Sequence, residues 1–344
     1  MSSLNRIGII GTGAIARKNA QAYKNIGFQI TACTNATESR GRMFARETGA
    51  AFVPTVEELC SRPDVDIVDV CTFPDYRLQP VELCAKSRKH VLVQKPMATN
   101  LDTARAMLKT AQQASIQLGV VSQHRFDDSI QFLKRAIAGN RLGKILQADA
   151  YVKWYRSAEY YSRPIKGSWD VEGGGALMNQ GIHQVDMLLY LIGPVSQVFG
   201  SWQLGAVHRI QSEDVLSALL RYGNGATGVI QAATAFWPGY PERIEIHGEK
   251  GTAIITGDKL TTWDMQNDSG EPAPIVREVS SGASDPMAIS TVPFERQFLD
   301  FAEACRTGTK PLTSAEEGYR ALQLVTAIYD SCRLNLPVDI PAGL

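Results

Sequence analysis

The sequence predicts an α/β protein: an N-terminal doubly wound Rossmann domain, followed by a C-terminal α+β domain with a large open, mostly antiparallel sheet. Three observations predict this fold class. Strand-like and helical segments alternate over the first third of the chain, a glycine-rich turn joins the first strand to the first helix, and strand follows strand from about residue 195 to 263. Because 344 residues exceed one typical core, we expect two domains, at residues 1–122 and 123–344.

Runs of β-branched and other apolar residues indicate the strands of the first domain, and apolar residues at helical spacing indicate its helices. The strands are expected at residues 6–10, 29–33, 67–71, 90–94 and 117–121, and the helices at residues 14–24, 39–48, 79–87 and 101–115. Helices of this length between strands imply right-handed crossovers, and therefore a parallel, doubly wound sheet.

The second domain is predicted to combine several helices with a run of strands. A strand is expected at residues 144–153, and residues 267–285, rich in Gly, Ser, Pro and Asp, indicate a loop. Helices are expected at residues 128–138, from a Gly-rich turn at 173–175 to about residue 192, near 293–306 and near 314–332. The last two could pack back on the first domain.

Composition argues against several classes of partner. The chain has 35 basic and 35 acidic residues, which gives no electrostatic reason to expect nucleic acid or a membrane surface. No apolar run approaches the roughly 18 residues that span a bilayer, and the N-terminus lacks the features of a secretory signal. The six cysteines show neither CxxC nor metal-type spacing. We therefore expect a cytoplasmic protein without a metal site.

A GxGxxA motif at residues 11–16 joins the first strand to the first helix. Gly11 allows a tight turn, and Gly13 lets the backbone approach a pyrophosphate. Ala14 and Ile15 begin the helix, whose free N–H groups suit phosphate binding. This context predicts a dinucleotide-binding site rather than an ordinary glycine turn.

The end of the second strand bears on the choice of cofactor. An NAD-preferring site usually has an acid here for the ribose hydroxyls, but this chain has Thr34 and Asn35, with Arg40 five residues later. Without a negative charge to repel a 2′-phosphate, the sequence favours NADP(H) over NAD(H). Alternatively, Asn35 caps the next helix and Arg40 is a surface charge, or Glu38 serves the ribose.

Two further candidates follow the third and fourth strands. Thr72 and the dipeptide Lys95-Pro96 come where strands of a parallel sheet present their carboxyl ends, which is where ligands bind in such sheets. Lys95 is therefore expected where a nicotinamide and a substrate meet, although most lysines are simply solvated surface groups.

A polar stripe marks the helix that follows the Gly-rich turn. Asn179, His183 and Asp186 are spaced i, i+4 and i+7, and so share one helix face among apolar neighbours. The stripe and the Gly-rich entry favour a catalytic helix over a core histidine with ordinary hydrogen bonds.

With these motifs, the sequence resembles the glucose–fructose oxidoreductase/inositol dehydrogenase/MocA-like family over nearly its whole length. The resemblance rests on the GxGxxA turn, Lys95-Pro96, the helix at 173–186, and the hairpin at 238–241 that leads to residues 247–251. It implies a Rossmann domain, a C-terminal open-sheet domain, and NAD(P)-linked redox chemistry on sugars, cyclitols or their derivatives.

The resemblance also implies roles for single residues. Lys95 matches the lysine of the family's Glu-Lys-Pro motif, and His183 matches the histidine of its catalytic helix. Two positions depart from the pattern: Gln94 replaces the glutamate, and Asn179 replaces an aspartate found in many members. Because an amide cannot take a proton, catalysis would fall on His183 and Lys95, which we expect to converge on the nicotinamide, while Asn179 would orient the substrate.

Other polar and aromatic residues are expected to bind the substrate, because aromatics stack on sugar faces and Arg pairs with carboxylates or phosphates. They are Arg125, Tyr155, Arg156, Tyr160, Arg163 and Asp186. The tyrosine and arginine cluster could instead be an interface or a loop. We also expect a homodimer or homotetramer, because an open sheet face needs covering.

Other functions remain open at this point. Some relatives cleave glycosides by a transient oxidation with bound NAD, so the chain could be an NAD-dependent glycoside hydrolase. It could also be a non-catalytic NADP(H)-sensing protein, or a reductase of dihydrodiols or linear-tetrapyrrole-like substrates.

Overall fold

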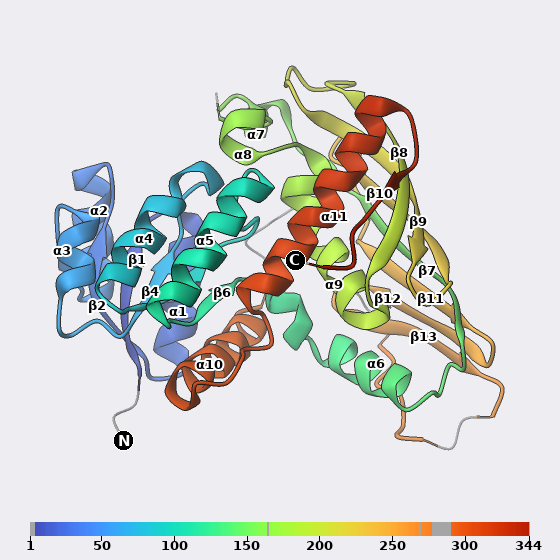
Figure 1. The fold of residues 1–344 in the computed structure, drawn as a ribbon, viewed down its shortest axis with the longest axis horizontal. Coiled ribbons are helices and arrows are strands. Elements are labelled where there is room, and N and C mark those ends of the chain that lie inside the picture. Colours follow the sequence, from blue (N-terminus) through green and yellow to red (C-terminus); the bar gives the residue numbers. More distant parts are fainter. Residues whose placement is uncertain (1–3, 164, 268–269, 277–289, 344) are drawn as a thin grey trace. The chain divides into compact units, whose positions relative to one another are not determined.

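The computed structural model describes residues 4–163, 165–267, 270–276 and 290–343, and the chain separates into two compact units (Figure 1). The first unit comprises residues 1–123 and 290–319, and the second comprises residues 124–289 and 320–344. The second unit thus interrupts the first in the sequence. Part of the loop expected at 267–285 lies outside the described residues.

The first unit contains a six-stranded parallel sheet in the order β3-β2-β1-β4-β5-β6. This is the strand order of a dinucleotide-binding Rossmann fold, and it confirms the predicted fold class. The order reverses between β1 and β4, so ligands are expected at the carboxyl ends of these two strands. The strands are β1 (Arg6–Ile10), β2 (Gln29–Thr34), β3 (Ala51–Phe52), β4 (Ile67–Val70), β5 (His90–Val93) and β6 (Leu118–Val120).

Six helices accompany this sheet: α1 (Ala14–Asn25), α2 (Glu38–Thr48), α3 (Val56–Ser61), α4 (Leu78–Lys86), α5 (Leu101–Ala114) and α10 (Val292–Thr307). The predicted strands and helices of this region agree with the observed ones to within one or two residues. Sequence analysis missed β3 and α3 because two and six residues are too short to show a period. Helix α10 packs on α1, where Tyr23 and Phe298 stack with ring centroids 4.1 Å apart.

The second unit contains an eight-stranded sheet in the order β13-β12-β11-β7-β10-β9-β8-β14. Among the described strands of this second sheet, only the β7–β10 pair is parallel, so the sheet is mostly antiparallel, as predicted. The strands are β7 (Ile145–Lys153), β8 (Val195–Leu204), β9 (Glu213–Tyr222), β10 (Thr227–Ala233), β11 (Arg243–Gly248), β12 (Gly251–Thr256), β13 (Lys259–Met265) and β14 (Val338–Asp339).

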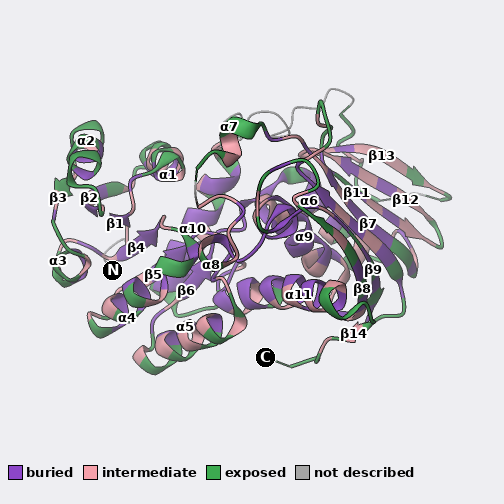
Figure 2. Cartoon of the chain, turned by 90° about the horizontal axis from the view of Figure 1, so that it is seen from above, coloured by how far each residue is buried: buried purple, intermediate pink, exposed green. Residues whose placement is uncertain are grey.

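Helices cover one face of this sheet (Figure 2). On β7, Ala148, Ala150 and Val152 are fully buried, and their small size lets α9 lie close to the strand. The helices with residues in this unit are α6 (Asp128–Ala138), α7 (Ala158–Tyr161), α8 (Trp169–Glu172), α9 (Ile182–Ile192) and α11 (Ala315–Leu334). No helix among the described residues has both the length and the apolar character needed to cross a bilayer.

The other face of the sheet carries a row of apolar side chains. Phe199, Leu219 and Val229 are cross-strand neighbours on β8, β9 and β10. Phe199 is 38% exposed and Leu219 is 58% exposed. Side chains alternate between the faces of a strand, so this row points away from the helices.

Candidate active site

The glycine turn after β1 is shaped to admit a ligand close to the main chain. Gly11 has φ +87°, and its N–H donates to the Thr34 carbonyl at 2.9 Å. A Cβ at Gly11 would lie 3.2 Å from the Cys71 carbonyl, whereas one at Gly13 would meet nothing within 4 Å. Gly13 is the N-cap of α1 and supplies no side-chain cap. The N–H groups of the first turn, including those of Ala14 and Ile15, therefore suit an anionic ligand.

Three buried polar atoms around this turn support the same interpretation. The hydroxyls of Thr12 and Thr72 and the side-chain amide nitrogen of Gln94 have no hydrogen-bond partner among the described residues. Buried polar groups are rarely left unsatisfied, so they mark a place where a ligand or water completes the bonding. The residues after β1, β4 and β5 thus fit a dinucleotide.

The end of β2 is tied to the glycine turn through Asn35. Its side-chain oxygen accepts a hydrogen bond from the Thr12 N–H at 3.0 Å, and its amide donates to the Thr37 carbonyl at 2.9 Å. Thr37, not Asn35, is the N-cap of α2. Glu38 pairs with Arg42 at 2.6 Å, whereas Arg40 is exposed and has no ion-pair partner among the described residues.

Arg77 organises the loop that carries Lys95. Its guanidinium, 3% exposed, donates to the carbonyls of Thr72, Gln94 and Pro96. Two of these carbonyls flank Lys95, whose side chain is partly exposed. Burial lowers the pKa of Arg77 to about 9, so the group still carries its charge near pH 7. Arg77 could not be predicted, because nothing in the sequence distinguishes it from a surface arginine at a helix start.

The second cluster is built around an irregular helix start. Leu177–Gly181 form a π-helical turn, a feature frequent at functional sites, and α9 continues from it. Glu213 on β9 accepts hydrogen bonds from the N–H groups of Gly175 and Leu177 at 2.9 and 2.8 Å, and from the Tyr329 hydroxyl at 2.7 Å. A Cβ at Gly175 would lie 1.9 Å from the Glu213 carbonyl oxygen, so the Gly-rich entry is required by close packing.

Asn179 and His183 occupy the accessible face of this helical segment. Both are partly exposed, whereas every other residue from 176 to 188 is buried. Asp186, the third member of the predicted stripe, is buried, with 4% of its surface exposed. Its carboxylate binds the Arg125 guanidinium through two hydrogen bonds of 2.9 and 2.7 Å. The segment therefore presents an amide and an imidazole together.

The aromatic and basic residues that follow β7 partly gather near this helix. The Gln180 amide donates to the Tyr160 hydroxyl at 3.3 Å, and the Arg156 guanidinium lies 5.9 Å from the centre of the Tyr160 ring. Arg156 is buried and also stacks on Trp154, with 4.8 Å to the ring centroid. Of the remaining candidates, Tyr155 contacts Trp237 and Arg163 is exposed.

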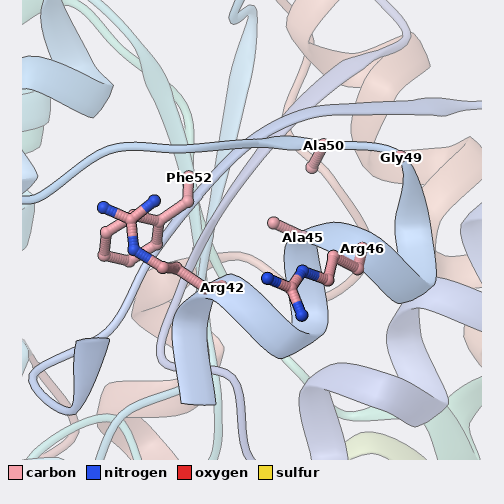
Figure 3. A pocket seen from close by; sticks show the side chains of 6 residues that line it. All are labelled: Arg42, Ala45, Arg46, Gly49, Ala50 and Phe52. Atoms are coloured by element: carbon pink, nitrogen blue, oxygen red, sulfur yellow. The ribbon is translucent and has the colours of Figure 1, made fainter. Parts of the chain in front are cut away.

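Two other clusters are explained without a ligand. Figure 3 shows a hollow between α2 and β3, lined by Arg42, Ala45, Arg46, Gly49, Ala50 and Phe52. The Arg42 guanidinium lies over the Phe52 ring, 4.9 Å from the ring centroid. Gly49 and Ala50 precede β3, so the hollow extends toward the amino end of that strand, away from the ligand-binding edge.

Asp149, Glu245 and His247 lie within metal-ligand distance of one another in the second unit. The Asp149 carboxylate accepts from Gln147 and the Val229 N–H at 2.8 Å each. Glu245 pairs with Arg243, and the Nδ1 atom of His247 lies 3.0 Å from the Thr252 hydroxyl. These polar groups therefore already have protein partners.

The chain combines a Rossmann sheet that has an open glycine turn with an α+β unit that exposes an imidazole. These features are those of a nicotinamide-dependent oxidoreductase. The comparison with family models agrees. A model described as "Oxidoreductase family, NAD-binding Rossmann fold" matches residues 5–122, and one for the GFO/IDH/MocA C-terminal domain matches residues 130–254. The chain belongs to the GFO/IDH/MocA oxidoreductase family.

Relatives and solved structures resemble the chain over nearly its whole length. It is 27% identical to a myo-inositol 2-dehydrogenase from Thermotoga maritima, over 93% of each chain. It is also 27% identical to a 1,5-anhydro-D-fructose reductase from Ensifer adhaerens, over 99% of this chain and 100% of the relative. The WlbA dehydrogenase of Bordetella pertussis, solved with NADH and UDP-GlcNAcA, superposes with a TM-score of 0.86 at 28% identity, over 98% of this chain and 99% of that one.

Proposed function

We propose that the protein transfers a hydride between NAD(P) and a hydroxyl or carbonyl carbon of a sugar, cyclitol or sugar derivative. The observation that carries this proposal is the partly exposed pair Asn179 and His183 on an otherwise buried helical segment. Several relatives of similar length are named for reactions on such alcohols, which supports the substrate class.

Each proposed catalytic residue has a distinct role. The nicotinamide supplies the hydride donor or acceptor. His183 takes the hydroxyl proton in oxidation and returns it in reduction, because an imidazole, with an ordinary pKa of about 6.5, exchanges protons near neutral pH. Lys95 stabilises negative charge on the substrate oxygen, and Asn179 donates a hydrogen bond to a neighbouring hydroxyl. Gly11, Gly13, Ala14, Ile15, Thr34, Asn35, Arg40 and Thr72 are proposed to hold the dinucleotide.

We assign residues 1–122 to cofactor binding and residues 123–344 to substrate binding and assembly, with the segment 290–319 returning to the first unit. Tyr155, Arg156, Tyr160 and Arg163 are proposed substrate contacts. For Arg125 and Asp186 we propose a different role: each neutralises the charge of the other in the interior, so they hold α9 in place instead of binding a ligand.

The test is net cofactor turnover at 340 nm with a panel of sugars and polyols. We expect absorbance to change with at least one of these alcohols or its carbonyl form. Cleavage of a glycoside without net change in NADH would instead identify the hydrolase. Cofactor binding without any turnover would identify a sensor, and turnover only with dihydrodiols or tetrapyrroles would overturn the substrate class.

We further propose a preference for NADP(H) over NAD(H). Glu38 is the acid considered above for the ribose hydroxyls, but its carboxylate pairs with Arg42. Arg40 adds an exposed cation that favours a 2′-phosphate. The WlbA dehydrogenases of Bordetella pertussis and a second species were solved with NADH, but this observation concerns those proteins and does not decide the cofactor of this chain. Thermal shift with the four cofactor forms tests the preference, and stronger stabilisation by NADH than by NADPH would contradict it.

A further inference from the structure

A second histidine lies against His183. The ring centroids of His124 and His183 are 5.0 Å apart, and the rings are nearly perpendicular at 84°. Both belong to the second unit, and the His124 side chain is 15% exposed. No motif in the sequence points to His124, which comes directly before Arg125.

The two rings are held together by their neighbours along the chain. Arg125 follows His124, and Asp186 lies one helical turn after His183, on α9. These two residues form the buried, two-pronged ion pair, with Arg125 1% exposed. Planar guanidinium–carboxylate pairing fixes both partners in direction as well as distance. The pair therefore sets the position of α9 relative to the turn that carries His124.

Asp127 fixes the orientation and the proton of His124. Its carboxylate, 6% exposed, lies 2.8 Å from the Nδ1 atom of His124. An ionised carboxylate can only accept, so Nδ1 carries a hydrogen and Nε2 is the nitrogen that loses or gains a proton. Burial opposes the charged imidazole, but Asp127, with Glu242 and Asp258 at longer range, raises the pKa of His124 above its ordinary value.

We propose that His124, oriented by Asp127, is a positioning residue that sets the protonation of His183. The proposal rests on the proposed function of His183. Two imidazoles this close cannot both be charged without repulsion, so they titrate as a pair. The proton that remains on His124 keeps His183 neutral and ready to accept the substrate hydroxyl proton.

This arrangement accounts for the amide at position 179. Asn179 cannot share a proton with His183 across the helix turn. The dyad of Asp127 and His124 supplies the missing carboxylate and a titratable partner from a different element. The charged groups around His124 are Asp127, Glu242 and Asp258, together with the Arg125–Asp186 pair, whose charges cancel.

The experiment compares His124→Asn with the unmodified protein by NMR titration of the histidine ring protons. Asn can still donate to Asp127 but cannot titrate, so a purely structural role is preserved. We expect the midpoint for His183 to rise by about 1 pH unit, because the neighbouring positive charge is gone. The chain has five histidines, so His183→Asn assigns the His183 signal. His247→Asn serves as the matched control, with an unchanged His183 midpoint.

A second variant and a kinetic readout complete the test. Asp127→Asn should lower the midpoint of His124, and the pH dependence of kcat should move with His183 in both variants. An unchanged His183 midpoint in His124→Asn overturns the inference. If the midpoint moves while His183→Ala retains normal turnover, the coupling stands and the proposed catalytic function fails.

Discussion

At the scale of single residues, the candidate site depends on groups whose partners are mostly main-chain atoms. Arg77 holds three carbonyls, Asn35 ties β2 to the glycine turn, and Glu213 holds the helix start. Through these main-chain contacts, Arg77 and Glu213 determine where Lys95 and the Asn179–His183 pair are presented. Displacing a catalytic group by about 1 Å can cost on the order of 100-fold in rate.

His183→Ala and Lys95→Ala should each lower kcat by at least about 100-fold, because each removes a group that we propose to interact with the reacting oxygen. Cofactor binding, measured by nucleotide-induced thermal shift, should be largely kept. Steady-state kinetics on the preferred substrate checks this expectation. A variant with near-normal turnover would remove that residue from the proposed chemistry.

Arg77→Met should reduce kcat about 10- to 100-fold with a smaller change in substrate KM, because three carbonyls, two of them buried, lose their donor and the Lys95 loop can shift. Arg77→Lys should recover part of the rate, since one ammonium can serve some of these carbonyls. Arg46→Met, an exposed arginine on α2, is the control and should have no effect. Unchanged kcat in Arg77→Met would show that the loop keeps its position without the guanidinium.

At the scale of elements, the π-helical turn that leads into α9 is stabilised by a buried acid. Glu213 is completely buried, and its carboxylate joins the Gly-rich turn to Tyr329 on α11. Desolvation raises the pKa of this carboxyl to about 7, although the main-chain N–H donors of Leu177 and Gly175 and the Tyr329 hydroxyl favour the anion. The helix start is therefore sensitive to pH.

Stability should fall as pH rises from about 4.5 to about 7, because over this range the folded chain keeps a proton on Glu213 that the unfolded chain releases. The full effect is about 3 kcal/mol in the free energy of unfolding. Glu213→Gln has no such proton, so its stability should depend less steeply on pH. Denaturant unfolding of both proteins at pH 5 and 7.5 measures the difference, and parallel pH dependence would contradict the assignment.

The sequence predicted elements well where a period was long enough to see. The five longer parallel strands and the α9 stripe were found because burial imposes a regular pattern. It could not reveal that Asp186 is buried and paired with Arg125 while Asn179 and His183 are partly exposed, because Arg125 lies 61 residues away along the chain. His124 was missed because His183 lies far from it along the chain, and Arg77 was missed because its partners are carbonyls, which every residue has.

At the scale of the whole molecule, the row Phe199, Leu219 and Val229 leaves an apolar stripe on the helix-free face of the second sheet. Large exposed apolar patches mark interaction sites. We propose that a second copy of the chain covers this stripe in a homodimer, or in a homotetramer built from such dimers, because closed symmetric assemblies are the usual arrangement of soluble oligomers.

Leu219→Arg should convert the assembly to monomers, since a charge placed in the middle of a buried apolar contact is costly. Light scattering coupled to size-exclusion chromatography gives the mass directly. Leu299→Arg changes an exposed leucine of the first unit and should leave the assembly intact. A monomeric unmodified protein, or an assembly unaffected by Leu219→Arg, would exclude this face as the interface.

The return of residues 290–319 to the first unit affects how the chain can fold during synthesis. The free edge of β6 is bridged by Ser314, and the Gln297 amide bonds Val120 and Thr313. A nascent chain that ends at residue 123 lacks these partners and presents an unpaired parallel strand, which is a template for aggregation. The nucleotide-binding unit therefore reaches its final form only after the second unit has left the ribosome. A fragment that ends at residue 123 is expected to aggregate.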